Sequence, residues 1–262
     1  MMNNSTSSIA VELPPLPPLP INLEDVRESH GFSDTAHWVI PNVLMQGDRP
    51  GLVISEDESD NDDAFLDQVR EIVEDGGCRT FVCAQAECAP EEGSILLDDD
   101  GGTRKPNPKD LPTYAKHVLS SVTKDNERLL GEKEGRLAKP AVFLYYGIIG
   151  METARSVDSL SNAVSDLADR IRSGGETIYI HCGGGVGRAG LLAACLLGEL
   201  YQDLDADMAM EYTTQLCYLR NNDDDDDVVE EGGRVVSHHY SSPETDGQKE
   251  QVREFFKKIR AK

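Results

Sequence analysis

Apolar residues in this chain occur either in short continuous runs or in series spaced three or four positions apart. The continuous runs predict buried strands, and they lie at 38–40, 43–45, 78–83, 141–146 and 177–180. The spaced series predict helices packed on one face, and they lie at 65–73, 153–173, 208–219 and 252–259. A short helix is expected at 114–122, and the almost wholly apolar segment 189–201 predicts a buried helix. This alternation predicts an α/β fold with a central, mostly parallel sheet flanked by helices.

Glycine, proline and capping residues set the expected limits of these helices. Gly76-Gly77 and Gly174-Gly175 end two of them, since glycine readily adopts the left-handed conformation that closes a helix. Ser242-Pro243 is expected to begin the last helix, with serine as the cap and proline in the first turn. Residues 85–112 are rich in Gly, Pro, Asp and Lys, which predicts a long excursion near the ligand-binding face.

The first 33 residues differ in composition from the rest of the chain. They begin with Met, Asn, Ser and Thr and lead into Pro14–Pro20, a polyproline II segment. We therefore expect a disordered, Pro-rich tail over residues 1–33 and one domain over residues 34–262. The PxxP spacing would suit a docking partner, but the Arg or Lys that usually fixes such a segment is missing. A stiff linker or an arm that covers the domain is the other interpretation.

Charge and cysteine content exclude several classes of function. A formal net charge of −23 argues against nucleic-acid binding, which needs clustered Lys and Arg. No signal-like N-terminus or membrane-length apolar run is present, so no membrane association is expected. The six cysteines lie mostly in apolar runs, which suits a reducing compartment, the cytoplasm or the nucleus.

Metal ligation has little support in the sequence, and no cofactor is expected. Cys83 and Cys88 lack a second pair at zinc-ligand spacing, so they are interpreted as buried thiols. The acidic run within 221–231 is interpreted as a solvated loop, with metal binding as an alternative.

The chemistry of the chain centres on the loop that follows the 177–180 strand. The strand stops at His181-Cys182, and Gly183, Gly184, Gly185, Val186, Gly187 and Arg188 lead into the apolar helix. Glycines let successive N–H groups converge, and the positive end of a helix adds to the attraction for phosphate. A cysteine in such a site is expected to have its pKa lowered from about 8.5 to roughly 3.5–7.5, which makes it a nucleophile. One alternative is that Cys182 is a buried thiol and the glycines form a tight turn. A second is a dinucleotide-binding loop, but such a loop needs bare backbone where this one has Cys182 and Arg188.

The His-Cys-(x)5-Arg spacing resembles the signature of the cysteine-dependent protein tyrosine phosphatases, especially the dual-specificity type. Residues 40–47, Ile-Pro-Asn-Val-Leu-Met-Gln-Gly, are similar to a stretch that often opens such domains. The resemblance implies that Cys182 is the nucleophile and that His181 orders the loop. It also implies that Arg188 and the N–H groups of residues 183–188 hold the phosphoryl oxygens, with no metal required.

The chain departs from the family pattern at two positions. The family's general-acid aspartate corresponds to Gly150, so Glu152 is the candidate that replaces it, and Asp158 is interpreted as part of a solvated helix face. Ala189 stands where a Ser or Thr hydroxyl normally assists the departing sulfur, so the intermediate is expected to break down slowly. Residues 242–248 are loosely similar to a water-positioning loop, with Glu244 in place of its first glutamine.

These observations predict a protein phosphatase that hydrolyses phosphotyrosine, with phosphoserine and phosphothreonine as further candidates, through a cysteinyl-phosphate. The partner implied is a phosphorylated protein. The alternative is a pseudophosphatase that binds phosphate but turns over poorly, which Gly150 and Ala189 favour. A phosphoinositide or phosphorylated-sugar substrate is a third interpretation, weakened because the loop contains no lysine.

Overall fold

The structure, a computed structural model, describes residues 15–19, 25–26, 29–31, 33–51, 61–98, 113–131, 139–221, 230–231, 234–235 and 241–261. Residues 99–112 of the expected excursion, most of the acidic stretch at 56–63 and the five aspartates at 223–227 lie outside the described residues.

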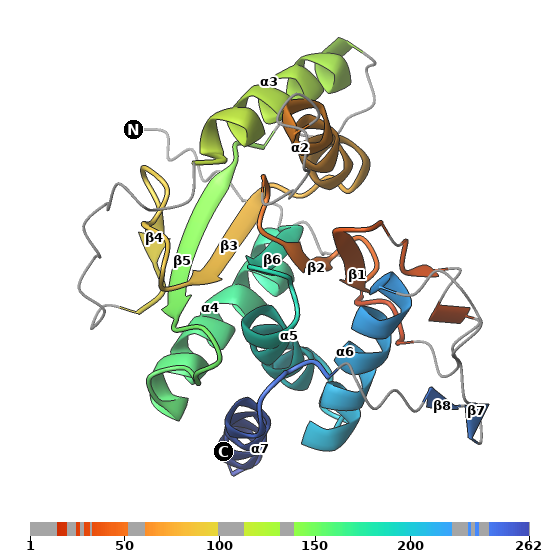
Figure 1. The fold of residues 1–262 in the computed structure, drawn as a ribbon, viewed down its shortest axis with the longest axis vertical. Coiled ribbons are helices and arrows are strands. Elements are labelled where there is room, and N and C mark those ends of the chain that lie inside the picture. Colours follow the sequence, from red (N-terminus) through yellow and green to blue (C-terminus); the bar gives the residue numbers. More distant parts are fainter. Residues whose placement is uncertain are drawn as a thin grey trace, which may run out of the picture.

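A six-stranded sheet forms the centre of the molecule (Figure 1). Its order is β1 (Ala36–Ile40), β2 (Leu44–Asp48), β6 (Ile178–Cys182), β3 (Thr80–Gln85), β5 (Val142–Ile148) and β4 (Ile95–Leu96). β1 and β2 form an antiparallel hairpin, and all the other pairs are parallel. The predicted mostly parallel sheet is therefore confirmed, with β6 in the interior between β2 and β3. A separate antiparallel pair is formed by β7 (Glu230–Glu231) and β8 (Arg234–Val235).

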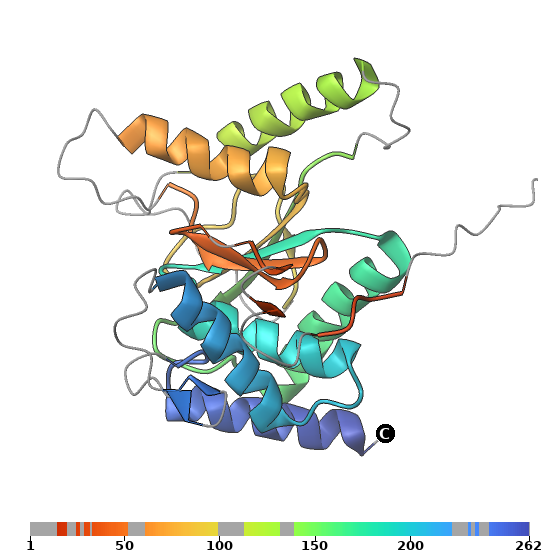
Figure 2. The same ribbon diagram turned by 90° about the vertical axis from the view of Figure 1, so that its right-hand side faces the viewer.

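Helices cover both faces of the sheet (Figure 2). One face carries α2 (Asn61–Arg70), its π-helical continuation η1 (Glu71–Asp75) and α3 (Ala115–Gly131). The other carries α4 (Val157–Gly174), α5 (Gly187–Leu200), α6 (Ala206–Asn221) and α7 (Asp246–Arg260). All but two residues of α5 are buried, because this helix lies between the sheet and the outer helices. No helix among the described residues has the length and apolar character needed to cross a bilayer.

Three helix limits differ from the sequence-based expectation. α4 begins at Val157 rather than Thr153, because Ser156 is extended and its side chain caps the Ser159 N–H. α7 begins at Asp246, with Thr245 and Gln248 forming a reciprocal capping box, so the expected start at Ser242 was wrong. α3 continues to Gly131, well beyond the expected end at residue 122.

Part of the N-terminal segment lies on the domain. Leu16 and Leu19 pack against the core beneath the sheet, and the Tyr201 hydroxyl donates to the Pro17 carbonyl at 2.7 Å. Val26 is 2% exposed, so packed residues occur before the expected boundary at residue 34. A partner that binds Pro14–Pro20 would have to displace these contacts, and such a partner stays a prediction.

Candidate active site

Cys182 ends β6 at the interior of the sheet, and the loop that follows it leads directly into α5. We call residues 182–188 the Cys182 loop. Cys182 is 3% exposed, and Asp48 of β2 lies opposite it in the parallel register. The capping position of α5 is Val186, whose side chain makes no capping hydrogen bond. The first N–H groups of this buried helix are therefore left for an anion at the carboxyl end of a central strand.

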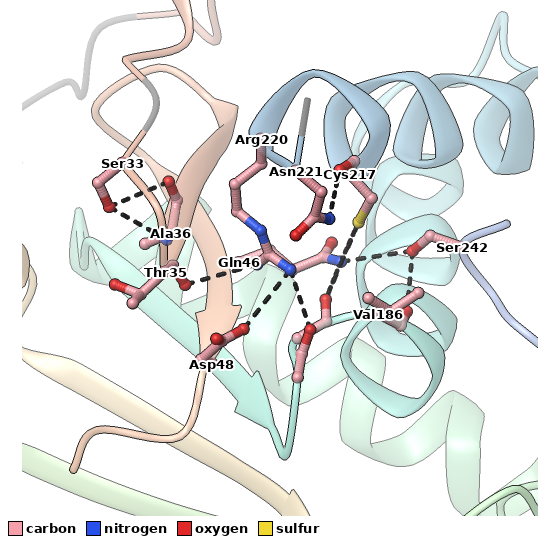
Figure 3. Close-up of polar contacts among 12 residues, drawn as sticks. Ser33, Thr35, Ala36, Gln46, Asp48, Val186, Cys217, Arg220, Asn221 and Ser242 are labelled. Carbon is pink, nitrogen blue, oxygen red and sulfur yellow. Dashed lines mark hydrogen bonds and ion pairs between the residues drawn. The ribbon is translucent and has the colours of Figure 1, made fainter. Parts of the chain in front are cut away.

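The carbonyl groups of the Cys182 loop are held from outside. Each carbonyl from residue 183 to residue 186 accepts a hydrogen bond from a donor on another element. Figure 3 shows the donors Arg220, Gln46 and Ser242. In order, the donors are the Arg49 N–H at 3.1 Å, the Arg220 guanidinium at 2.9 Å, the Gln46 amide at 2.6 Å and the Ser242 hydroxyl at 2.9 Å. We call these four donors the carbonyl clamp.

The clamp determines what the N–H groups of the loop can do. Among the described residues, none accepts a hydrogen bond from the backbone N–H groups of Gly183 through Arg188. Because the carbonyls are fixed to the scaffold, these N–H groups remain available for a bound group beside Cys182. A curl of successive N–H groups at a helix N-terminus is a site for a phosphoryl anion.

The close approach of β2 explains two glycines. Gly185 has φ +62°, and a Cβ placed on it would lie 2.4 Å from the Gly47 carbonyl carbon. A Cβ on Gly47 would in turn lie 2.4 Å from the Thr35 carbonyl oxygen and 2.5 Å from the Tyr179 hydroxyl. Only glycines fit at both positions, because backbone lies against backbone there. Gly185 therefore lets the loop approach the Gly47 backbone, and Gly47 leaves room for Thr35 and Tyr179.

Arg188 lies over the Cys182 loop from the first turn of α5. Its Nη1 donates to the Glu87 carboxylate at 2.5 Å and to the Ile148 carbonyl at 3.2 Å, and its Nη2 lies 3.8 Å from a Cβ built on Gly183. Burial lowers the pKa of Arg188, but the Glu87 hydrogen bond and the neighbouring Cys182 sulfur outweigh it and raise the pKa. The guanidinium is therefore charged and positioned at the mouth of the loop.

His181 points away from the loop into a buried polar network. The ring is fully buried, and its Nε2 lies 2.8 Å from the Tyr114 hydroxyl at the start of α3. Arg49 lies over the Tyr114 ring at 5.0 Å and pairs with Glu91 at 3.5 Å. Burial, followed by the positive charge of Arg49, holds the pKa of His181 well below its usual value, so the imidazole is neutral at pH 7. His181 is therefore held rigidly next to Cys182 in the chain by the Tyr114 hydrogen bond, and its role in ordering the loop stays a prediction.

Asp48 is the second carboxylate close to the Cys182 loop. Its Oδ1 lies 3.5 Å from Nη2 of Arg220, whose side chain is 1% exposed (Figure 3). Burial raises the pKa of Asp48 to about 6, although the Arg220 charge acts in the opposite direction. Asp48 therefore faces the clamp arginine.

The other thiols have no comparable surroundings. All six cysteines are buried and free. Burial raises the pKa values of Cys78, Cys83, Cys195 and Cys217, so these four are neutral at physiological pH. Nowhere in the described part of the chain do three His, Cys, Asp or Glu side chains gather as possible metal ligands. A reducing compartment suits this set of thiols and stays a prediction.

The positions considered for the general acid, Gly150, Glu152 and Asp158, are all exposed. Gly150 is exposed, with nothing within 4 Å of a Cβ built on it. Glu152 is exposed in the same turn, and its carbonyl accepts from the Gln248 amide at 3.0 Å. Asp158 is 86% exposed and pairs with Lys258, as expected for a solvated helix face. The structure thus places the Glu152 turn beside the start of α7 and gives the carboxylate no contact with Cys182.

Sequence reasoning missed most residues that shape the loop. Gln46 and Arg220 were not expected at the site, because nothing local marks a polar residue that reaches a distant backbone carbonyl. Ser242 lies in the stretch similar to a water-positioning loop, but its hydrogen bond to the Val186 carbonyl was not expected. Glu87 had a usable signal: it follows β3, and residues after the carboxyl ends of neighbouring parallel strands meet at one edge.

Residues 150–222 match a family model described as "PTP-SAK: Swiss Army Knife protein, DSP-PTPase phosphatase domain". This segment is therefore similar to a dual-specificity-type phosphatase domain. The match contains β6, the whole Cys182 loop and the α5 and α6 helices, including the clamp residue Arg220. The resemblance seen in the sequence is therefore confirmed for this segment, and the chain has the predicted mostly parallel sheet with flanking helices. No curated protein matches the chain.

Several solved structures resemble this chain at a distance. Tk-PTP in its active form has 15% identity and a TM-score of 0.49, covering 86% of this chain and 98% of its own. PTPMT1 in complex with PI(5)P has the same identity and TM-score, and the match covers 86% of this chain and 97% of the PTPMT1 chain. A leucine-rich-repeat and phosphatase-domain protein from Entamoeba histolytica has 14% identity and a TM-score of 0.42, covering 87% and 94%. At this distance no property of those proteins carries over to this chain.

Proposed function

We propose that this phosphatase domain hydrolyses phosphotyrosine in proteins through a cysteinyl-phosphate intermediate, with phosphoserine and phosphothreonine as further candidate substrates. The observation that carries the proposal is the orientation of the Cys182 loop. The carbonyls of residues 183–186 accept hydrogen bonds from the clamp, and the N–H groups of the loop donate to no other described residue. Arg188 lies over the loop. This arrangement suits a phosphoryl group with three equatorial oxygens directly above a sulfur nucleophile.

In the first step, the Cys182 thiolate attacks phosphorus, so that a sulfur–phosphorus bond forms and the ester oxygen–phosphorus bond breaks. The loop N–H groups and Arg188 bear the charge on the equatorial oxygens, and the planar guanidinium can bind two of them. We assign Glu152 as the acid that protonates the leaving oxygen, because the matched family position is Gly150. His181 is a positioning residue, since it is fully buried and bonded to Tyr114.

In the second step, water attacks the cysteinyl phosphate and the sulfur leaves as thiolate. Ala189 is fully buried in the first turn of α5 and offers no hydroxyl to stabilise that sulfur. We therefore expect the second step to limit turnover.

The rival function is a phosphate-binding pseudophosphatase. Gly150 and Ala189 favour it, because each removes a group that the reaction normally uses. Both functions keep Cys182 and Arg188 at the loop, but only the enzyme releases phosphate repeatedly.

A phosphoinositide substrate fits the surroundings of the loop less well than a peptide. Glu87 contacts Arg188 directly, and the Glu244 carboxylate lies against Gly187, so two carboxylates flank the phosphoryl position. Additional phosphates on a headgroup would be repelled there, since like charges that are close together destabilise a complex.

A steady-state assay of the purified protein with an aryl phosphate and with phosphotyrosine, phosphoserine and phosphothreonine peptides tests the proposal. Wild type is expected to release phosphate with many turnovers, and Cys182→Ser is expected to release none. Peptide binding by both proteins without turnover by wild type would establish the pseudophosphatase instead. A headgroup phosphoinositide measured in parallel is expected to be the poorer substrate.

A further inference from the structure

Glu244 lies in the turn before α7, directly against the Cys182 loop. A Cβ placed on Gly187 would lie 2.8 Å from the Glu244 Oε2 and 3.2 Å from its Cβ. The side chain of Glu244 is exposed, and among the described residues none forms a hydrogen bond or an ion pair with its carboxylate. A free carboxylate therefore lies beside the first residue of α5, one position before Arg188.

The position of this carboxylate is fixed by a buried amide. Gln248 is fully buried, and its Oε1 accepts from the backbone N–H groups of Glu244 at 3.0 Å and Thr245 at 3.3 Å. Its Nε2 donates to the Glu152 carbonyl at 3.0 Å. One side chain thus ties together the two turns that carry Glu152 and Glu244, next to the loop.

The other carboxylates around the loop are already engaged by cations. Glu87 binds Arg188, Asp48 pairs with Arg220, and Glu91 pairs with Arg49. Proton uptake by any of these three carboxylates would remove the charge that holds it against its arginine. Glu244 pairs with no arginine or lysine among the described residues, so it can take up a proton without breaking such a contact.

We propose that Glu244 is a second catalytic carboxylate, the base that takes a proton from the water that hydrolyses the cysteinyl phosphate. This inference rests on the proposed function. The water oxygen forms a bond to phosphorus as its proton passes to the Glu244 carboxylate. The sulfur–phosphorus bond breaks, and its electron pair leaves with sulfur as the Cys182 thiolate. Phosphate departs, and Glu244 loses its proton to solvent.

Rapid-mixing kinetics with 4-nitrophenyl phosphate separate the two steps, because nitrophenolate is released in the first step and needs no proton. Wild type is expected to show a burst of about one equivalent followed by slower turnover. Glu244→Gln should keep the burst rate and lower the later steady rate by about 10²–10⁴-fold. The steady rate of wild type should rise with pH as the base loses its proton, and the steady rate of Glu244→Gln should not show this rise. Asp246→Asn is the matched control, since Asp246 is an exposed acid in the first turn of α7, and it should match wild type.

Three results decide the inference. A steady rate in Glu244→Gln equal to that of wild type, with the burst intact, overturns it. If both the burst and the steady rate fall together, Glu244 acts on the structure of the loop, which also overturns it. Partial recovery of the steady rate in Glu244→Ala by added formate supports it, because a small carboxylate can replace a base but not a packing contact. A wild-type protein with no Cys182-dependent release of nitrophenolate, in the burst or in the steady state, would instead defeat the proposed function itself.

Discussion

Replacing Asp48 by asparagine is predicted to stabilise the folded protein at neutral pH and to weaken its activity. Asp48 faces Arg220 at 3.5 Å, and its Oδ1 is buried without a hydrogen bond from any described residue. Burial raises the pKa of Asp48 from 3.8 to about 6 even though Arg220 favours the charged form. The site therefore prefers the neutral acid, which asparagine resembles in shape and charge.

The magnitude follows from the two pKa values of Asp48. The folded value of about 6 lies above the unfolded value of 3.8, so the folded state binds the proton more tightly. The stability that this proton provides is complete below 3.8 and is lost as pH rises through 6. One pKa unit corresponds to about 1.4 kcal/mol. Ionisation of the Asp48 carboxyl therefore lowers the free energy of unfolding by about 3 kcal/mol at pH 7 and by about 0.5 kcal/mol at pH 4. Asp48→Asn should recover these amounts.

Denaturant unfolding of Asp48→Asn and wild type between pH 4 and pH 7 measures the difference. Comparing the two proteins cancels other titrating groups such as His37, whose pKa is lowered by burial and by Arg220 in both. At pH 7 the variant should also melt about 6–12 °C higher. Asp158→Asn, at an exposed aspartate, is the control and should change stability little and without this pH dependence.

Activity should change in the opposite direction. Asp48 holds the charge of Arg220 beside the Gly184 carbonyl, so its loss loosens the clamp, and kcat/KM should fall by about 10-fold or more. A variant no more stable than wild type at pH 7, or with a gain that does not shrink toward pH 4, would refute the reasoning.

Two further predictions concern the groups that act on the phosphoryl oxygens. Arg188→Lys should keep the fold but lose about 10²–10³ in kcat and most affinity for vanadate, since an ammonium cannot bind two oxygens as a planar fork does. Steady-state kinetics and circular dichroism check this, and nearly full turnover would make Arg188 structural. Glu152→Gln should slow phosphotyrosine hydrolysis by about 10²–10⁴ and hardly affect an activated aryl ester. If Glu152→Gln changes the rate on neither substrate, Gly150→Asp should raise phosphotyrosine turnover. A wild-type protein that already hydrolyses phosphotyrosine briskly and is insensitive to Glu152→Gln would point to another acid.

The parts of the fold that depend on local sequence were predictable. The β6 strand, the Cys182 loop and α5 follow from a continuous apolar run, a glycine cluster and a second apolar run, all of which act over short distances. The start of α7 was misplaced because Ser242 and Thr245 are both capping residues. Only the fold shows that the Ser242 hydroxyl binds the Val186 carbonyl, which leaves the cap to Thr245.

The clamp could not be predicted, because it depends on tertiary contacts. Arg220 lies in the last turn of α6, where a basic residue usually faces solvent and interacts with the helix dipole. Here it is buried and reaches the Gly184 carbonyl, 36 positions away in the chain. Gln46 likewise occupies a buried strand position that hydrophobic patterning assigns to an apolar side chain. The contacts that orient the loop are therefore those that periodicity cannot reveal.

The central claim is that Cys182 carries the phosphoryl group during turnover. Acid quenching of wild type within the first turnover of an aryl phosphate, followed by peptide mass spectrometry, tests it directly. The account predicts a phosphoryl adduct on the peptide that contains Cys182 and on no other cysteine peptide, with neither adduct nor phosphate release in Cys182→Ser. Phosphate release that persists in Cys182→Ser, or an adduct on a different residue, would contradict it.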